Sequence, residues 1–134
     1  MTTFPKKYSA GATPPIFVTL VERVVPLLIE GTHPAMAALR EQYRRSRIRE
    51  VELTGAGFYI DFDVPMDAPL ADPPNFAGGN ARILLKGAAC EAGCVLFVRN
   101  GRLATLEGYT YDAPWPEDAG AVLAVGNVTP VFPE

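Results

Sequence analysis

The stretch from Val51 to Val64, VELTGAGFYIDFDV, decides the predicted fold class of this chain. From residue 58 to residue 64, apolar side chains alternate strictly with polar ones, and a period of two is typical of a strand with one buried face. A shorter alternating segment precedes it, and the link Thr54-Gly55-Ala56-Gly57 has the composition of a tight turn. The stretch therefore predicts a β-hairpin.

The segment before this hairpin has helical periodicity. Apolar residues recur three and four positions apart from Pro15 onward, and Gly31 suits the end of a helix. Pro26 lies inside this segment and is expected to kink or split the helix, because it removes one backbone hydrogen bond. A second helix is predicted to start at Thr32-His33-Pro34 and to run to about Arg47.

The segment after the hairpin predicts further strands. Residues 65–79 are expected to form a proline-rich loop, and strands are expected at 81–86, 95–99, 103–109 and 121–125. Asn100-Gly101 is the strongest short hairpin signal, because both central residues of a type I′ turn need positive φ. We therefore expect an α+β fold, in which two N-terminal helices precede an antiparallel sheet of about five or six strands. Residues 1–14 are expected to form a flexible tail, and residues 15–134 a single domain.

Composition and charge limit the classes of function. The chain has 134 residues, 49% of them hydrophobic, and a net charge of −3, which argues against a nucleic-acid partner. The apolar run at 16–29 contains charged residues and a proline and is shorter than the roughly 20 residues that span a bilayer. No membrane partner is therefore expected, and a cytoplasmic location is the default. Cys90 and Cys94, as thiols or as one local disulfide, do not make a secreted disulfide framework.

The register of the first hairpin predicts an acidic patch on the outer face of the sheet. If Leu53 pairs with Phe58, and the register continues until Ile48 lies opposite Asp63, one face carries four carboxylates: Glu50, Glu52, Asp61 and Asp63. Such a patch could bind a cation or a basic partner, or it could be a solvated face neutralised by Arg82 and Lys86 of the next strand. We favour the solvated face and expect no metal, because charged outer faces are common and no ligand spacing is present.

The register of the second hairpin draws attention to Glu107. Pairing Arg99 with Arg102 places Glu107 opposite Cys94, at the end of an otherwise apolar strand. Both faces of these strands are largely apolar, which predicts central strands that are covered on both sides or packed in a dimer. Burial would raise the pKa of Glu107, whereas a nearby arginine would keep it ionised.

The same strand leads into an aromatic segment, Leu106–Asp118 (LEGYTYDAPWPED). Glu107, Tyr109, Tyr111 and Trp115 could form a binding site, because Tyr and Trp combine a large apolar surface with a polar group. Alternatively, the segment is a structural corner that pins the last hairpin to the body, with an extended exit enforced by its two prolines. We favour the corner and keep the site as the alternative.

No residue pattern predicts catalytic, metal or cofactor chemistry. His33 is the only histidine, and its position at a predicted helix cap explains it without a catalytic role. Cys90 and Cys94 are four positions apart, unlike the C-x-x-C spacing of redox and zinc motifs. The glycines do not compose a phosphate-binding loop. We therefore expect no catalytic residue and no cofactor.

Two segments resemble a family of small uncharacterised bacterial proteins. One is TGAGFYIDFDVP, with a T-G-x-G-F motif, and the other is GCVLFVRNGRLATLEGYTYDAPWPED, with the motif L-E-G-Y-T-Y-x-x-P-W-P. The resemblance covers about residues 39–118, and the segment 90–94 is outside the family pattern. It implies a family and an α+β fold but no activity.

These observations predict a non-enzymatic binding or protein-interaction module. Its partner would be another protein or a second copy of the chain, and an immunity-like role is one form of this function, suggested by small size and acidic charge. The alternative is a small enzyme with an acid-based site around Glu107, Tyr109, Tyr111 and Trp115. That alternative requires these groups to converge in a concave pocket.

Overall fold

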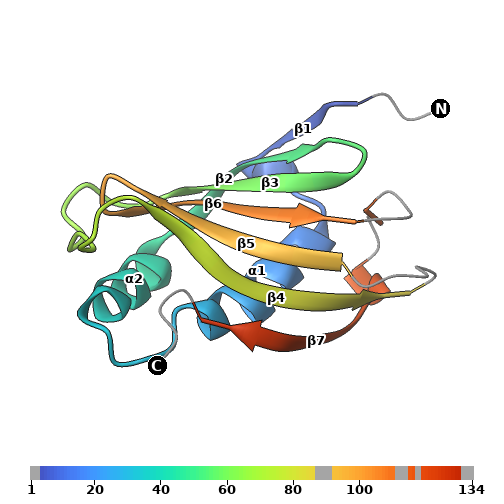
Figure 1. Cartoon of the computed structure of the whole chain (residues 1–134). Coiled ribbons are helices and arrows are strands. Elements are labelled where there is room, and N and C mark those ends of the chain that lie inside the picture. The colour runs from blue at the N-terminus through green and yellow to red at the C-terminus, as the bar shows by residue number, and fades with distance from the viewer. Residues whose placement is uncertain (1–3, 87–91, 111–114, 117–118, 131–134) are drawn as a thin grey trace.

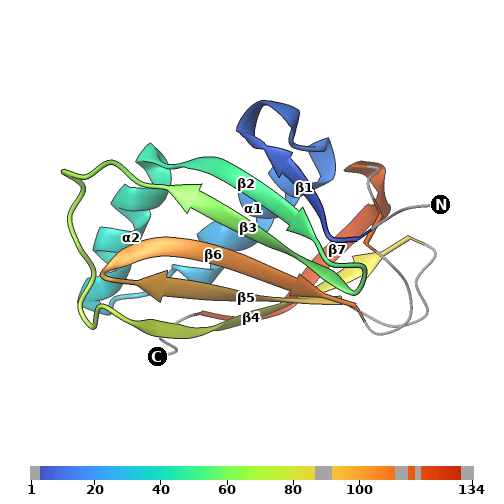
Figure 2. The ribbon, with the colours of Figure 1, turned by 90° about the horizontal axis from the view of Figure 1, so that it is seen from above.

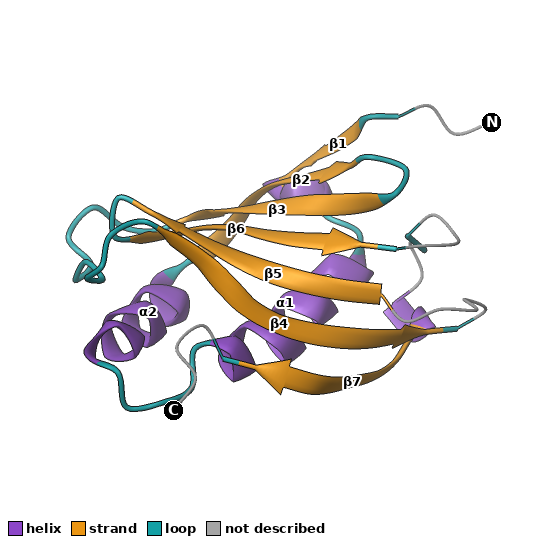
Figure 3. Cartoon of the chain, in the orientation of Figure 1, coloured by secondary structure: helices purple, strands orange, loops and turns teal. Residues whose placement is uncertain are grey.

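The computed structural model describes residues 4–86, 92–110, 115–116 and 119–130. In this part of the chain, seven antiparallel strands form one sheet, and two helices cover one of its faces (Figure 1, Figure 3). The predicted α+β class is confirmed, with a strand count slightly higher than expected. The elements are β1 (Lys6–Ser9), the 3-10 helix η1 (Ala10–Ala12), α1 (Pro15–Leu28), α2 (Pro34–Arg45), β2 (Arg47–Leu53), β3 (Gly57–Asp63), β4 (Phe76–Leu85), β5 (Ala92–Arg99), β6 (Arg102–Tyr109), the 3-10 helix η2 (Ala119–Ala121) and β7 (Val122–Thr129).

The first helix supplies most of the core that faces the sheet. Seven residues of α1 are buried, at the spacing of one helix face: Ile16, Phe17, Leu20, Val21, Val24, Val25 and Leu28. Pro26 lies in the last turn, so α1 continues through it as one helix and ends at Leu28. The expectation of a split helix is wrong, because a proline this close to the end leaves little helix to interrupt.

The second helix begins as the sequence predicts. The Nδ1 atom of His33 accepts a hydrogen bond from the Ala35 N–H at 3.1 Å, which satisfies one of the free donors of the first turn. Pro34 occupies the first helical position. The helix ends at Arg45, slightly before the predicted end, because the chain becomes extended at Ser46 and enters β2.

The strand order in the sheet is β1-β2-β3-β6-β5-β4-β7. Both predicted hairpins, β2–β3 and β5–β6, are present. The expectation of a flexible tail is wrong for residues 6–9, which form β1 at the sheet edge beside β2. The proline-rich loop is shorter than expected, since β4 begins at Phe76 and lies between β5 and β7, not beside β3. The last strand extends to Thr129.

The central pairing of the sheet is between β3 and β6, which brings the two motif segments side by side. Phe58 lies opposite Gly108, and a Cβ atom at Gly108 would overlap with the Phe58 ring. On the other face, the Tyr109 side chain covers Gly93 of β5 in the same way. These glycines are therefore required for close approach of aromatic rings to the backbone.

Substitution Gly108→Ala should lower the free energy of unfolding by about 1–3 kcal/mol, because the new methyl group overpacks against Phe58. Chemical denaturation measures the loss. In the double variant with Phe58→Leu, the cost of Gly108→Ala should be smaller. Gly126→Ala is the matched control, since a Cβ at Gly126 in β7 meets no atom within 4 Å. Equal effects at the two glycines would contradict the packing role of Gly108.

A β-bulge in β2 changes the end of the first hairpin. The predicted pairs from Leu53 to Glu50 are correct, but Arg49 is an extra residue in the ladder. Asp63 consequently lies opposite Arg47 instead of Ile48. The bulge therefore places the cation Arg47 opposite the Asp63 carboxylate, whereas a continuous register would place the apolar Ile48 there.

A second bulge, at Ala104 in β6, changes the position of Glu107. Arg99 pairs with Arg102 as predicted, but the shift after Leu103 sets Glu107 opposite Val95. The predicted pair of Glu107 with Cys94 is therefore wrong. A shift of one residue moves a side chain to the other face of a strand, so Glu107 leaves the core side.

A buried amide joins α2 to the β5–β6 hairpin. Gln42 is completely buried, and its Nε2 donates to the carbonyl oxygens of Pro69 and Gly101, each at 2.7 Å. Its Oε1 accepts from the Leu103 N–H at 2.8 Å. All three partners are backbone groups, so one side chain fixes the loop before β4 and the Asn100-Gly101 turn against the helix. Both turn residues have positive φ, as predicted.

Candidate functional site

One face of the sheet has no covering layer among the described residues. Both helices pack against the other face, and from above the strands lie in front of them (Figure 1, Figure 2). We call the uncovered side the open face. Tyr59 and Leu84 are 40% and 43% exposed on it, and Val95, Phe97 and Tyr109 are half-buried there. The open face thus combines exposed aromatic and aliphatic side chains.

Charged residues surround these apolar side chains. Tyr59 stands in the middle of a cross-strand row that runs from β1 to β5 through five residues: Lys7, Glu52, Tyr59, Glu107 and Val95. The next row on this face contains Phe97 and Thr105. Arg99 lies over the ring of Phe97 at 5.4 Å and donates to the hydroxyl of Thr105 at 3.2 Å. The face is therefore a mixture of both charges and aromatic groups.

The predicted acidic patch lies on the open face, with cations of its own. Lys7 Nζ is 3.8 Å from Glu50 Oε1, and Arg49 Nη2 is 3.5 Å from Asp61 Oδ2. Asp61 also accepts a hydrogen bond from the hydroxyl of Thr105 at 2.8 Å. The patch is consequently a partly neutralised surface.

The predicted source of neutralisation is wrong. Arg82 belongs to β4, and β6 and β5 separate that strand from β3. Lys86 follows the end of β4 and lies no closer in the strand order. The cations beside the patch come instead from the N-terminal strand and from the bulge in β2.

The candidate site at Glu107, Tyr109, Tyr111 and Trp115 is not assembled as one cluster. Glu107 and Tyr109 lie on the open face, whereas Trp115 packs on the helix side and is 5% exposed. The rings of Trp115 and Phe58 meet edge to face, with centroids 4.7 Å apart. Tyr111 lies outside the described residues. Trp115 therefore has the position that the corner interpretation requires.

The other residues considered for catalysis or metal binding, where the structure describes them, have structural roles. His33 caps α2, as described above. Cys94 is a free thiol in the core, and burial raises its pKa far above the usual range, which suppresses its reactivity. Cys90 lies outside the described residues. Among the residues described, no group of three or more His, Cys, Asp and Glu side chains could hold a metal ion.

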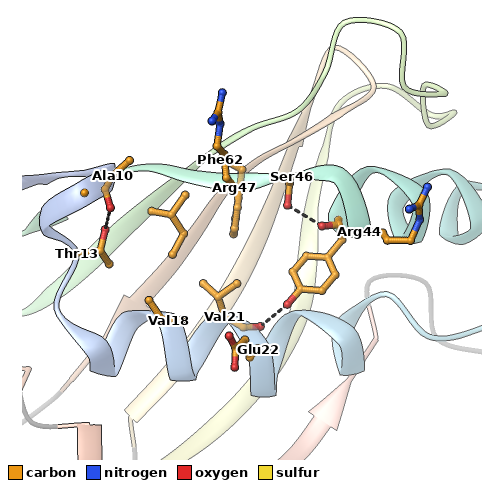
Figure 4. A pocket seen from close by; sticks show the side chains of 12 residues that line it. Ala10, Thr13, Val18, Val21, Glu22, Arg44, Ser46, Arg47 and Phe62 are labelled. Carbon is orange, nitrogen blue, oxygen red and sulfur yellow. Dashed lines mark hydrogen bonds between the residues drawn. The ribbon is translucent and has the colours of Figure 1, made fainter.

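A cavity that the sequence did not suggest lies on the helix side, between α1 and the start of β2 (Figure 4). Its volume is about 650 Å³, within the range of small-molecule sites. It is lined by Ala10, Gly11, Thr13, Val18, Val21, Glu22, Tyr43, Arg44, Ser46, Arg47, Ile48 and Phe62. We call it the α1–β2 cavity. The sequence signal for it is Val18, an apolar residue outside the apolar stripe of the first helix, and the structure leaves Val18 39% exposed.

A smaller cavity of about 480 Å³ lies beside β2, lined by residues 45–47 and 63–66. Neither cavity includes Glu107. The acid-based site predicted around Glu107 therefore lies in neither of these two cavities.

The chain matches no protein-family model, no curated protein and no solved structure. The resemblance of its two motif segments to a bacterial family thus stays a prediction. In the part of the chain that the structure describes, no helix is long and apolar enough to span a bilayer.

Proposed function

We propose that the chain is a non-enzymatic protein-interaction module, which binds its partner through the open face of the sheet. The observation that supports this proposal is the exposure of Tyr59 and Leu84 on a sheet face that no described element covers. Tyrosine offers a large, stiff contact surface at low entropic cost and is enriched at protein interfaces. An uncovered sheet face that carries both charges beside an exposed tyrosine suits a folded protein better than a small substrate, which binds in a concave site.

The enzymatic alternative has less support. Glu107 and Tyr109 lie on the open face, while Trp115 lies in the core on the other side of the sheet. An acid on an open face has no enclosed space in which to hold and orient a substrate. Glu107 fits the proposed interface instead, as a charged neighbour of Tyr59. An immunity-like role is one form of this function, in which the partner would be a toxic protein.

The double substitution Tyr59→Thr with Leu84→Thr should weaken partner binding at least tenfold. It removes the two most exposed apolar contacts of the open face, and threonine suits a strand, so the fold should persist. Partners recovered with the tagged chain would be purified and titrated by calorimetry against both forms. Met66→Thr is the matched control, because Met66 is 85% exposed in a loop and should not affect binding.

A second measurement distinguishes a different partner from a second copy of the chain. The edge strand β7 favours self-association by strand pairing, because its eight residues include no charge and no proline. The other edge strand, β1, is short and has two lysines, which oppose such pairing. Light scattering of the purified chain measures this directly. A monomer that recovers no partner, or equal weakening by Met66→Thr, would contradict the proposed function.

A further inference from the structure

The α1–β2 cavity has an apolar body. Its walls include Val18 and Val21 of α1, which project toward β2, and Ile48 and Phe62 of the sheet (Figure 4). The short helix η1 lines one end, and the pairing of β1 with β2 holds it beside the sheet. A volume of about 650 Å³ with such walls suits a ligand that has an aromatic or branched hydrocarbon body.

The hydroxyl groups that line the cavity have already used their hydrogen atoms. Thr13 Oγ1 donates to the Ala10 carbonyl at 3.1 Å, Ser46 Oγ donates to the Tyr43 carbonyl at 2.8 Å, and Tyr43 OH donates to the Val21 carbonyl at 3.4 Å. A carbonyl oxygen cannot donate, so each hydroxyl is fixed as the donor of its bond. What these side chains still offer to a ligand is acceptor capacity.

The charged residues at the rim of the cavity also favour a ligand that donates hydrogen bonds. Glu22 lines the cavity from α1, and among the described residues no ion pair involves it. Arg44 is held by Glu41 through two hydrogen bonds of 3.0 and 2.6 Å. Arg47 points away from the cavity and lies opposite Asp63 in the sheet (Figure 4). The uncompensated charge that faces this space is therefore negative.

We propose that the α1–β2 cavity binds a small organic cation, with an apolar ring-sized body and one ammonium group. The body would lie against Val18, Val21 and Phe62, and the ammonium group, which only donates hydrogen bonds, would meet Glu22 and the free acceptor positions of the hydroxyls. The ring of Tyr43 in the same wall is a further favourable neighbour for a cation. This site is on the helix side of the sheet and is independent of the proposed interface.

Three probes of one shape test the assignment: naphthylmethylamine, naphthylmethanol and naphthoate, which are cationic, neutral and anionic at neutral pH. In titrations followed by protein amide NMR, the amine should cause saturable shifts at the cavity residues. The affinity of the amine should exceed that of naphthoate by about five- to tenfold, because Glu22 attracts the cation and repels the anion. The difference stays modest because the site is partly exposed to solvent. The alcohol should lie between them.

Two variants localise the effect. Glu22→Gln should lower the affinity for the amine by about two- to fivefold and remove most of the discrimination against naphthoate. Glu30→Gln, which changes the net charge equally but lies outside the cavity lining, should leave both unchanged. Val18→Phe should abolish amine binding by filling the cavity, with folding checked by circular dichroism.

The assignment is overturned by any of three results. The first is an affinity for naphthoate equal to that for the amine in the wild-type chain. The second is saturable shifts that map outside the cavity lining or persist in a folded Val18→Phe variant. The third is the absence of saturable shifts with all three probes. None of these results bears on the open face, so the two proposals fail separately.

Discussion

Replacing Trp115 with alanine should lower the free energy of unfolding by about 3–5 kcal/mol, the usual cost of truncating a large buried aromatic side chain. Trp115 is 5% exposed and packs edge to face on Phe58, which itself meets Phe17 of α1 with ring centroids 5.3 Å apart. The three rings connect the segment after β6, the central strand β3 and the first helix. Removing the indole leaves a cavity at the end of this series.

Chemical denaturation followed by circular dichroism measures the loss, since Trp115 is the only tryptophan and its fluorescence disappears with the substitution. Trp115→Phe is the matched variant. No described group accepts a hydrogen bond from the buried indole N–H. Phenylalanine therefore loses buried apolar area but no hydrogen bond, and this substitution should lower the free energy of unfolding by only about 1–2 kcal/mol. A loss below about 1 kcal/mol for the alanine variant would contradict the corner and favour a surface role for the tryptophan.

Replacing Gln42 with leucine should lower the free energy of unfolding by about 2–4 kcal/mol, although leucine is similar in size to glutamine and more apolar. The Leu103 N–H and the Pro69 carbonyl lose the partner that Gln42 provides, and each backbone group left unsatisfied inside the protein costs about 1–3 kcal/mol. The Gly101 carbonyl is less affected, because it also accepts from the Ala71 N–H at 2.9 Å.

The control for Gln42 is its neighbour Glu41, whose side chain pairs with Arg44 at the surface of α2. Glu41→Gln should change stability by less than about 0.5 kcal/mol, as surface substitutions usually do. Hydrogen exchange adds a local measurement, since the Leu103 amide should lose protection in Gln42→Leu. Unchanged exchange at Leu103, together with unchanged stability, would show that the buried amide does not fix the hairpin.

The hairpins, the helix starts and the fold class could be predicted from the sequence because each depends on neighbouring residues. Strict alternation at 58–64 specifies a strand, Asn100-Gly101 specifies a tight turn by its backbone conformation, and His33-Pro34 specifies a helix start. The alternation of the two strands also predicted correctly that Glu50 and Asp61 lie opposite each other on one face of the sheet.

The candidate site could not be predicted in the same way, because contacts between distant segments decide it. The bulge at Ala104 moved Glu107 to the open face, and the packing of Trp115 on Phe58 separated it from Glu107 and Tyr109. Gln42 has a role only because three backbone groups from a loop, a turn and the start of β6, all far along the chain, surround it.

The sequence by itself determined that this chain forms two helices and then strands that pair as local hairpins, since turn chemistry and periodicity act over a few residues. The tertiary structure alone decided that β3 pairs with β6, that residues 6–9 join the sheet, and that a cavity remains between α1 and β2. The physical reason is that long-range strand pairing is selected by side-chain fit, such as Phe58 over Gly108. That fit exists only when both segments are already in place.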